Sequence, residues 1–313
     1  MKHLTIIPLI AALLLTASCT KVLEFDGTET EPMPVLISLP EADSTLSLRL
    51  TFSRFFLSRN SYKPIDNATF RTELNGTSVS ANLTYDDNGI YRSNLILHEN
   101  DTLTLHVSIP DQKEITAGCR VPARPNISDL QTTINIHYDT SYFDWIDSTF
   151  SVYTYRDIDI SFRLHDPAGQ CNYYMLQAYT IDSTTGDRIY LNNIIDDNIL
   201  FDTVANEYSL NLGGSTDLSK GYQTFFTDER INGKNHTIKV NIDTYGNFSG
   251  DIYFDICALS RDTYLYHVTL LNQENSDDIM GFLSEPVQIH TNIQNGIGIL
   301  GASTPLRIKL TNQ

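Results

Sequence analysis

Strict alternation of apolar and polar residues is the feature that most limits how this chain can fold. Between Thr45 and Phe52 the residues at positions 46, 48, 50 and 52 are Leu, Leu, Leu and Phe, and the residues between them are Ser, Arg and Thr. Successive side chains of a strand point to opposite faces, so this period of two predicts a half-buried β-strand. Similar segments recur along the chain and favour a mainly β fold.

Short strands separated by turn-forming residues are predicted through the first part of the chain. Asn75-Gly76 is typical of a tight hairpin, and the segment Asp86–Gly89 contains residues that tolerate a positive φ. This spacing predicts a β-sandwich of immunoglobulin-like or transthyretin-like shape over residues 35–124. The further strands expected there are Ala68–Leu74, Val79–Tyr85, Gly89–Leu95, Thr102–Ile109 and Glu114–Val121.

A second β-rich domain, again of sandwich type, is expected over residues 125–313. Pro122 and Pro125 cannot continue a central strand, so they predict the boundary between the domains. One short helix is predicted, with Ser260 as its N-cap and an apolar stripe that ends at Asn272. The strands expected in this domain are Asp157–Leu164, Tyr173–Ile181, Ile238–Ile242, Asp251–Leu259, Glu285–Ile289 and Leu306–Leu310.

The first 18 residues have the composition of an export signal. A short polar start precedes an apolar run from Leu4 to Leu15, which is too short to span a bilayer as a helix. Small residues at positions 16–18 lead directly to Cys19, as in the lipobox that a lipoprotein signal peptidase cuts once the thiol carries a lipid. We therefore expect a signal peptide over residues 1–18, lipidation at Cys19 and an acidic tether over residues 19–34. The alternative is an ordinary secreted protein cut nearby.

Charge and cysteine content limit the classes of partner. The formal net charge is −17 at pH 7, and loss of Lys2 with the leader makes it −18. Such an acidic chain repels nucleic acid and anionic lipid headgroups. In an oxidising compartment Cys119, Cys171 and Cys257 allow at most one disulfide. Their apolar, strand-like surroundings fit buried unpaired thiols at least as well.

Motifs of known catalytic sites are missing from the sequence. It contains no HExxH zinc motif, no GxSxG elbow, no Walker loop and no EF-hand loop, and its histidines are scattered. We therefore expect no enzyme activity, no cofactor and no metal site.

The densest unusual stretch runs from Tyr138 to Tyr155 and mixes aromatic residues with aspartates. Exposed aromatic side chains with few cations nearby suit a protein interface or a sugar-binding platform. The alternative is an aromatic-rich pair of strands with a covering loop. If the stretch is an interface, its candidate residues are Tyr142, Phe143, Trp145 and Tyr153.

Five blocks of sequence carry a family resemblance: SCTKVLEFDGTETEP near the start, then Tyr62–Ala68, Asp166–Tyr174, Phe225–Lys234 and Glu285–Ala302. Taken in order, they resemble the domain-of-unknown-function family 4249 over essentially the whole mature chain. The resemblance implies an outer-membrane lipoprotein of Bacteroidota, often encoded beside a TonB-dependent receptor, and it implies no catalytic activity. The first domain also resembles carboxypeptidase-regulatory-like sandwiches, which implies a role in adhesion or stability.

The resemblance also implies O-glycosylation, which in this lineage modifies Asp-Ser or Asp-Thr followed by a small or aliphatic residue. The sites that fit are Ser44, Ser148, Ser183 and Thr203, together with Thr102, which lies in a predicted strand.

Two hypotheses of function follow. In the first, the chain is a lipid-anchored, surface-exposed protein of the outer membrane that serves a TonB-dependent receptor as an accessory or ligand-capture partner in nutrient uptake. In the second, it is a structural or adhesive cell-surface lipoprotein without a transport partner.

Overall fold

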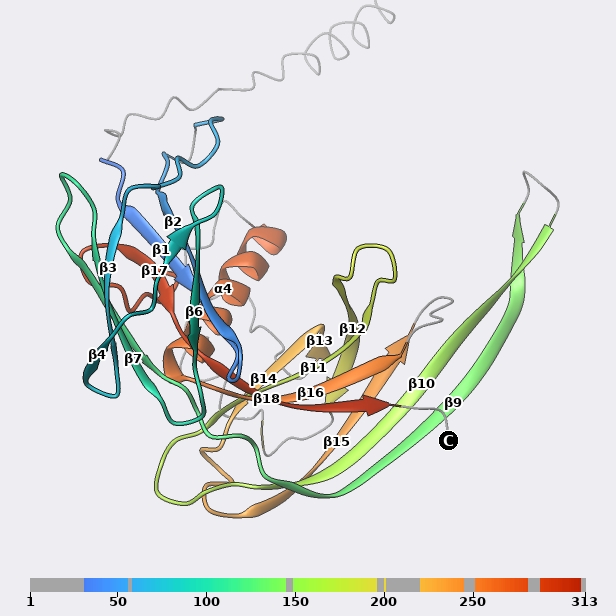
Figure 1. The fold of residues 1–313 in the computed structure, drawn as a ribbon. Coiled ribbons are helices and arrows are strands. Elements are labelled where there is room, and N and C mark those ends of the chain that lie inside the picture. The colour runs from blue at the N-terminus through green and yellow to red at the C-terminus, as the bar shows by residue number, and fades with distance from the viewer. Residues whose placement is uncertain are drawn as a thin grey trace, which may run out of the picture.

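The computed structural model of the chain describes residues 31–55, 58–144, 149–195, 200, 220–244, 251–280 and 288–310. Within the strands and the helix, the side chains of residues 139–154, 220, 243 and 275–280 are not described. The described part is mainly β, as the sequence predicts. Figure 1 shows two sheet-built lobes with one helix, α4, between them.

Two sheets form the first sandwich. One sheet has the strand order β17-β1-β2-β6-β5 and the other the order β4-β3-β7-β8. Their buried side chains, among them Leu36, Leu50, Leu103 and Ile115, form a single cluster. The bounds are β1 (Pro34–Ser38), β2 (Thr45–Phe52), β3 (Thr69–Leu74), β4 (Thr77–Val79), β5 (Thr84–Tyr85), β6 (Ile90–Ile96), β7 (Thr102–Ser108), β8 (Ile115–Arg120) and β17 (Ile297–Leu300).

Strand β2 has the bounds and the alternation that the sequence predicts, with all three of its leucines buried. The hairpin at Asn75-Gly76 is also confirmed, with φ values of 54° and 76°. The prediction of one strand over Val79–Tyr85 is wrong. Asn82 has a positive φ of 44°, which interrupts the extended backbone and leaves the two short strands β4 and β5.

A nine-stranded sheet forms the second lobe. Its main order is β18-β16-β11-β12-β15-β10-β9, with β13 beside β12 and β14 beside β11. The sheet curls over its own core, so that Phe162 of β10 and Phe254 of β16 lie 6.2 Å apart between ring centroids in one buried cluster. The bounds are β9 (Ile127–Asp144), β10 (Thr149–His165), β11 (Tyr173–Ile181), β12 (Arg188–Ile195), β13 (Lys220–Gly221), β14 (Gln223–Thr227), β15 (Asn235–Thr244), β16 (Ile252–Leu259) and β18 (Ser303–Leu310).

The predicted strands of the second half are confirmed in position except for Glu285–Ile289. Residues 285–287 lie outside the described residues, and residues 288–290 are not in a strand. The strands of this half that were not among those expected from the sequence are β9, β12, β13, β14 and β17.

Helix α4 (Arg261–Met280) packs on the second sheet through a buried cluster that is separate from the main core of that lobe. Its N-cap is Ser260, as predicted, because the backbone N–H of Thr263 donates to Ser260 Oγ at 3.3 Å. The helix is twenty residues long, so the prediction of a short helix ending near Asn272 is wrong. Most residues of the helix after Asn272 are polar. The apolar pattern therefore stops before the helix does, and periodicity alone places the end too early. No helix in the described part of the chain is long and apolar enough to cross a membrane.

The two lobes share the stretch of chain from Ile297 to Leu310. β17 pairs in parallel with β1 and completes the first sheet, and directly afterwards β18 pairs antiparallel with β16 in the second. Leu300 belongs to the first core and Leu310 to the second. The division into residues 35–124 and 125–313 stays a prediction, and it has to accommodate a strand that the C-terminal part supplies to the first sandwich.

Gly298 is the residue of β17 that tolerates no side chain. Its φ is 113°, and a Cβ there would collide with the carbonyl oxygen of Leu36 on β1. We expect Gly298→Ala to lower the free energy of unfolding by about 3 kcal/mol or more in denaturant titrations. The control is Gly118→Ala in β8, where the new Cβ would lie 3.5 Å from the carbonyl oxygen of Leu103. Equal losses in the two variants would contradict this account.

His267 on α4 gives the fold a pH dependence. It is half-buried, its ring stacks 5.4 Å from that of Phe225, and burial lowers its pKa from 6.5 to about 4. The unfolded chain therefore takes up this proton first, so the stability linked to His267 is complete above pH 6.5 and is lost as the pH falls toward 4. In His267→Phe, the difference in unfolding free energy between about pH 7 and about pH 5 should shrink by about 1 kcal/mol. An unchanged difference would rule the assignment out.

Candidate functional site

The outer part of the β9–β10 hairpin is a two-stranded ribbon. β15 pairs with β10 only from Arg156 to His165, whereas β9 pairs with β10 as far as Asp144 and Thr149. Among the described residues, no third strand accompanies the hairpin beyond Arg156, and Figure 1 shows it projecting past the rest of the sheet. Two strands alone are only marginally stable in water, so a partner bound here would add stability.

The base of this ribbon exposes apolar side chains. Tyr138 is 70% exposed and Ile136 is 41% exposed. Between these two residues, His137 of β9 stacks on its paired residue Tyr155 of β10, with 5.0 Å between ring centroids. The ribbon therefore begins with aromatic and aliphatic surface that is open to solvent.

The predicted interface residues fall on this ribbon. Tyr142 and Phe143 lie on β9 and Tyr153 lies on β10, in the part where side chains are not described. Trp145 lies outside the described residues. The pairing of Tyr138–Asp144 with residues 149–154 confirms the pair of strands that the sequence allowed as an alternative. The binding role of these residues stays a prediction.

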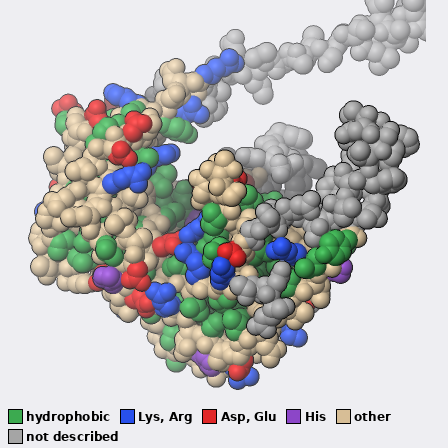
Figure 2. Space-filling view, turned by 45° about the vertical axis from the view of Figure 1, so that its right-hand side comes forward, with side chains coloured by type: hydrophobic (Ala, Val, Ile, Leu, Met, Phe, Trp, Pro, Cys, Tyr) green, Lys and Arg blue, Asp and Glu red, His purple; other side chains and the backbone are tan. Residues whose placement is uncertain are grey.

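A second candidate is a cleft of about 660 Å³ at the junction of the two lobes. Its walls come from the linker after β8, the loop before β11 and the start of α4, and include Arg120, Arg124, Tyr173 and Arg261. Figure 2 shows acidic and basic side chains gathered near the hollow between the lobes. Guanidinium, amide and aromatic groups together suit a small polar molecule better than an apolar one.

Arg124 in the linker holds the two lobes together. Its Nε donates to Glu99 Oε1 at 2.8 Å, its Nη2 to Asp43 Oδ2 at 2.9 Å, and its Nη1 to the carbonyl oxygen of Pro305 on β18 at 2.9 Å. Its backbone N–H also donates to Glu99, which is the main reason that the pKa of Glu99 is lowered. The pKa of Asp43 is lowered mainly by its hydrogen bond with His98.

A second charged link connects the lobes through Asp255. This carboxylate is fully buried in β16 and accepts from Arg307 Nε and Nη2, both at 2.9 Å. Arg307 also donates to Glu41 of the first lobe at 3.3 Å, and Arg188 donates to Glu41 at 3.0 Å. Both guanidinium groups lie over the ring of Tyr179, at 4.7 Å for Arg188 and 5.8 Å for Arg307. Burial is the main cause that raises the pKa of Tyr179 to about 12.

Two buried carboxylates join two of the sequence blocks that carry the family resemblance. Asp166 accepts from Tyr174 Oη at 2.8 Å and from the backbone N–H of Gly233 at 2.9 Å. Asp228 accepts from Asn172 Nδ2 at 3.1 Å, and burial raises the pKa of Asp228. Because these carboxylates are buried and bonded to fixed donors, their contacts lock the turn after β14 to the loop before β11.

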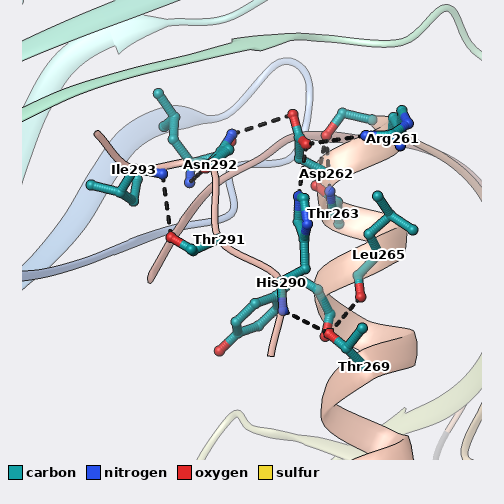
Figure 3. A network of polar contacts seen from close by, with 12 residues as sticks. Arg261, Asp262, Thr263, Leu265, Thr269, His290, Thr291, Asn292 and Ile293 are labelled. Carbon is teal, nitrogen blue, oxygen red and sulfur yellow. Dashed lines mark hydrogen bonds and ion pairs between the residues drawn. The ribbon is translucent and has the colours of Figure 1, made fainter. Parts of the chain in front are cut away.

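A polar network ties the segment before β17 to the first turns of α4 (Figure 3). His290 Nε2 lies 2.8 Å from Asp262 Oδ1, and the backbone N–H of His290 donates to Thr269 Oγ1 at 2.9 Å. Asn292 Nδ2 donates to Asp262 Oδ2 at 3.3 Å and to the carbonyl oxygen of Leu300 at 2.8 Å. The network therefore fixes the approach of the chain to β17.

The three cysteines among the described residues are unpaired thiols. Cys119 and Cys257 are buried, and burial raises the pKa of both, that of Cys119 to about 12. The expectation of apolar, strand-like surroundings is wrong for Cys171, which is exposed in the loop before β11. The described residues contain no group of three or more His, Cys, Asp or Glu side chains that would hold a metal ion. The expected lack of enzyme activity, cofactor and metal stays a prediction.

The predicted modification sites have different surroundings. Ser183 is exposed in the turn between β11 and β12. Ser44 is half-buried, and its Oγ donates to the carbonyl oxygen of Glu41 at 2.5 Å. Thr102 is exposed at the start of β7. Cys19, Ser148 and Thr203 lie outside the described residues.

The comparison with protein families decides where the chain belongs. A family model described as a domain of unknown function, DUF4249, matches residues 20–309. The chain belongs to this family. A search of curated proteins finds no match. The DUF4249 match covers strands of both lobes, including β17 and β18.

The charged links at the junction were missed in the sequence. Glu41 and Arg307 are 266 positions apart, and Arg124 reaches a carbonyl oxygen 181 positions away. A single charged residue on a strand gives no signal of such a partner. Asp255 offered the one available hint, since it stands inside the apolar run of β16 where an unpaired carboxylate would be costly.

We expect Arg307→Met to destabilise the protein strongly. The substitution leaves the carboxylate of Asp255 buried without its cation, which costs about 3–5 kcal/mol of unfolding free energy. The double variant Arg307→Met with Asp255→Asn should recover part of that loss because it removes the charge. Chemical unfolding of the two variants beside the parent measures the effect, and a double variant less stable than Arg307→Met would refute it.

Proposed function

We propose that this DUF4249 protein is an accessory lipoprotein of the outer membrane that docks on a TonB-dependent receptor and helps it to capture its ligand in nutrient uptake. The proposal combines the lipobox ending at Cys19 with the family membership and with the shape of the second lobe. A lipid at Cys19 would hold the body at the membrane, and the acidic tether would let it stand clear of the headgroups.

The observation that carries the proposal is the two-stranded ribbon. It contains the aromatic stretch Tyr138–Tyr155 and lacks a third strand among the described residues. A long ribbon that is marginal alone and aromatic in composition suits insertion against a larger protein. The junction cleft has no described residue of the ribbon in its lining, so it supports the proposal less directly.

The test is a mild-detergent pull-down of the lipidated protein tagged after Gln313, with mass spectrometry of what accompanies it. The variant replaces residues 139–153 with Asn-Gly, which joins Tyr138 to its paired residue Thr154 by a two-residue turn. We expect near-stoichiometric recovery of a TonB-dependent receptor with the intact chain, and a loss of about tenfold or more with the shortened ribbon.

The matched control shortens a different hairpin in the same sheet. Replacing residues 182–187 with Asn-Gly joins the paired residues Ile181 and Arg188 and leaves the ribbon intact. This control should recover the receptor as well as the parent does. If the parent protein is recovered alone, the proposal fails and the structural or adhesive hypothesis gains support.

A further inference from the structure

The outer edge of β9 is unbroken from Gln131 to Tyr138, between two register shifts in its pairing with β10. β9 has eighteen residues, and among the described residues it pairs only with β10. From Leu130 to Asp144 its sequence contains no Pro, Gly, Lys or Arg. Proteins normally protect an exposed edge with such residues, with bulges or with very short strands, because an open edge can pair with another chain.

The strands at the other ends of the three sheets carry this protection. β5, β4 and β17 are two, three and four residues long. The edge of β8 is met by Gln294, which forms a bridge with Thr116. β18, at the opposite end of the nine-stranded sheet, contains Pro305, Arg307 and Lys309. Among the strands that end the three sheets, β9 is therefore the one beside which an additional strand would fit.

The hydrogen bonds of Arg156 fix which groups of β9 point outward. The backbone N–H of Arg156 donates to Thr244 Oγ1 and its carbonyl oxygen accepts from the same hydroxyl, so both groups face β15. Arg156 pairs with Ile136, whose own N–H and C=O must then point away from β10. The register is unbroken from Gln131 to Tyr138, so Thr132, Ile134 and Tyr138 share this orientation with Ile136.

We propose that this edge accepts an extended segment of another protein as an added β-strand, and that the segment carries Lys or Arg among β-branched residues. β9 contains no Lys or Arg, and its Asp139 and Asp144 are acidic. The third aspartate of the strand, Asp129, is already paired with Arg163 of β10 at 3.1 Å. A second copy of the chain would place one acidic strand beside another and would add to a net charge of −17. A cation-bearing segment complements the edge. The inference rests on the proposed docking function and specifies how the partner binds.

The test uses the full chain and a proline at one outward-facing position. Ile136→Pro removes an N–H that the added strand needs but that the β9–β10 ladder does not use. Ile136→Thr is the matched control, because it removes the same exposed side chain and keeps the N–H. Thr132→Pro is the second proline variant, for use if Ile136→Pro does not fold by circular dichroism.

The probe is a displayed library of short random peptides, selected on the full-length protein and then synthesised singly. We expect selected peptides rich in Lys, Arg and β-branched residues, with affinity for Ile136→Pro weakened about tenfold or more and affinity for Ile136→Thr nearly unchanged. Failure to select such peptides, or equal binding to the proline variants, would overturn the proposal.

Two further outcomes would show that the outer edge of β9 is occupied by something other than a partner protein. A dimer in sedimentation that Ile136→Pro abolishes would assign the edge to a second copy. Slow amide exchange at Thr132, Ile134 and Ile136 in the free monomer would assign it to another segment of this chain. Receptor recovery that is the same for Ile136→Pro and the parent would leave the docking function standing and reject only this mode of binding.

Discussion

The parallel pairing of β17 with β1 is the contact on which the rest of the structure depends. It brings a strand from near the C-terminus into the first sheet, and the same stretch of chain continues at once into the second sheet as β18. Each lobe therefore has its own buried core, yet neither consists of one contiguous segment. The network around His290 and the missing side chain at Gly298 both serve this strand.

Charged side chains reinforce the junction between the lobes, which the consecutive strands β17 and β18 also connect. Arg124 binds both lobes from the linker, and Arg307 joins the buried Asp255 to Glu41 across the junction. Ion pairs exposed to water contribute little, but a guanidinium that neutralises a fully buried carboxylate cannot be removed without a large cost. Strands β17 and β18 and the charged links together hold the lobes in a defined arrangement. A protein that presents a projecting ribbon to a partner needs such an arrangement.

Local sequence patterns predicted the parts of the fold that local physics determines. The alternation in β2, the Asn75-Gly76 turn and the Ser260 cap were all confirmed, because each depends on residues within a few positions of one another. The aromatic stretch was visible for the same reason. The ribbon itself was not predicted, since it depends on where β15 ends beside β10, which among the described residues is at Arg156. The role of β17 was equally hidden, because its partner β1 lies more than 250 positions earlier in the chain.

The position of β17 also orders events during synthesis. The ribosome completes β1 to β8 long before it reaches Ile297, so the first sheet has an open edge at β1 until β17 has been made. A product that stops early lacks the strand that closes this sheet, and its exposed edge invites the aggregation and degradation that remove incomplete chains. Closure of the first sheet by β17 thus makes synthesis as far as residues 297–300 a condition for stable folding of the first lobe.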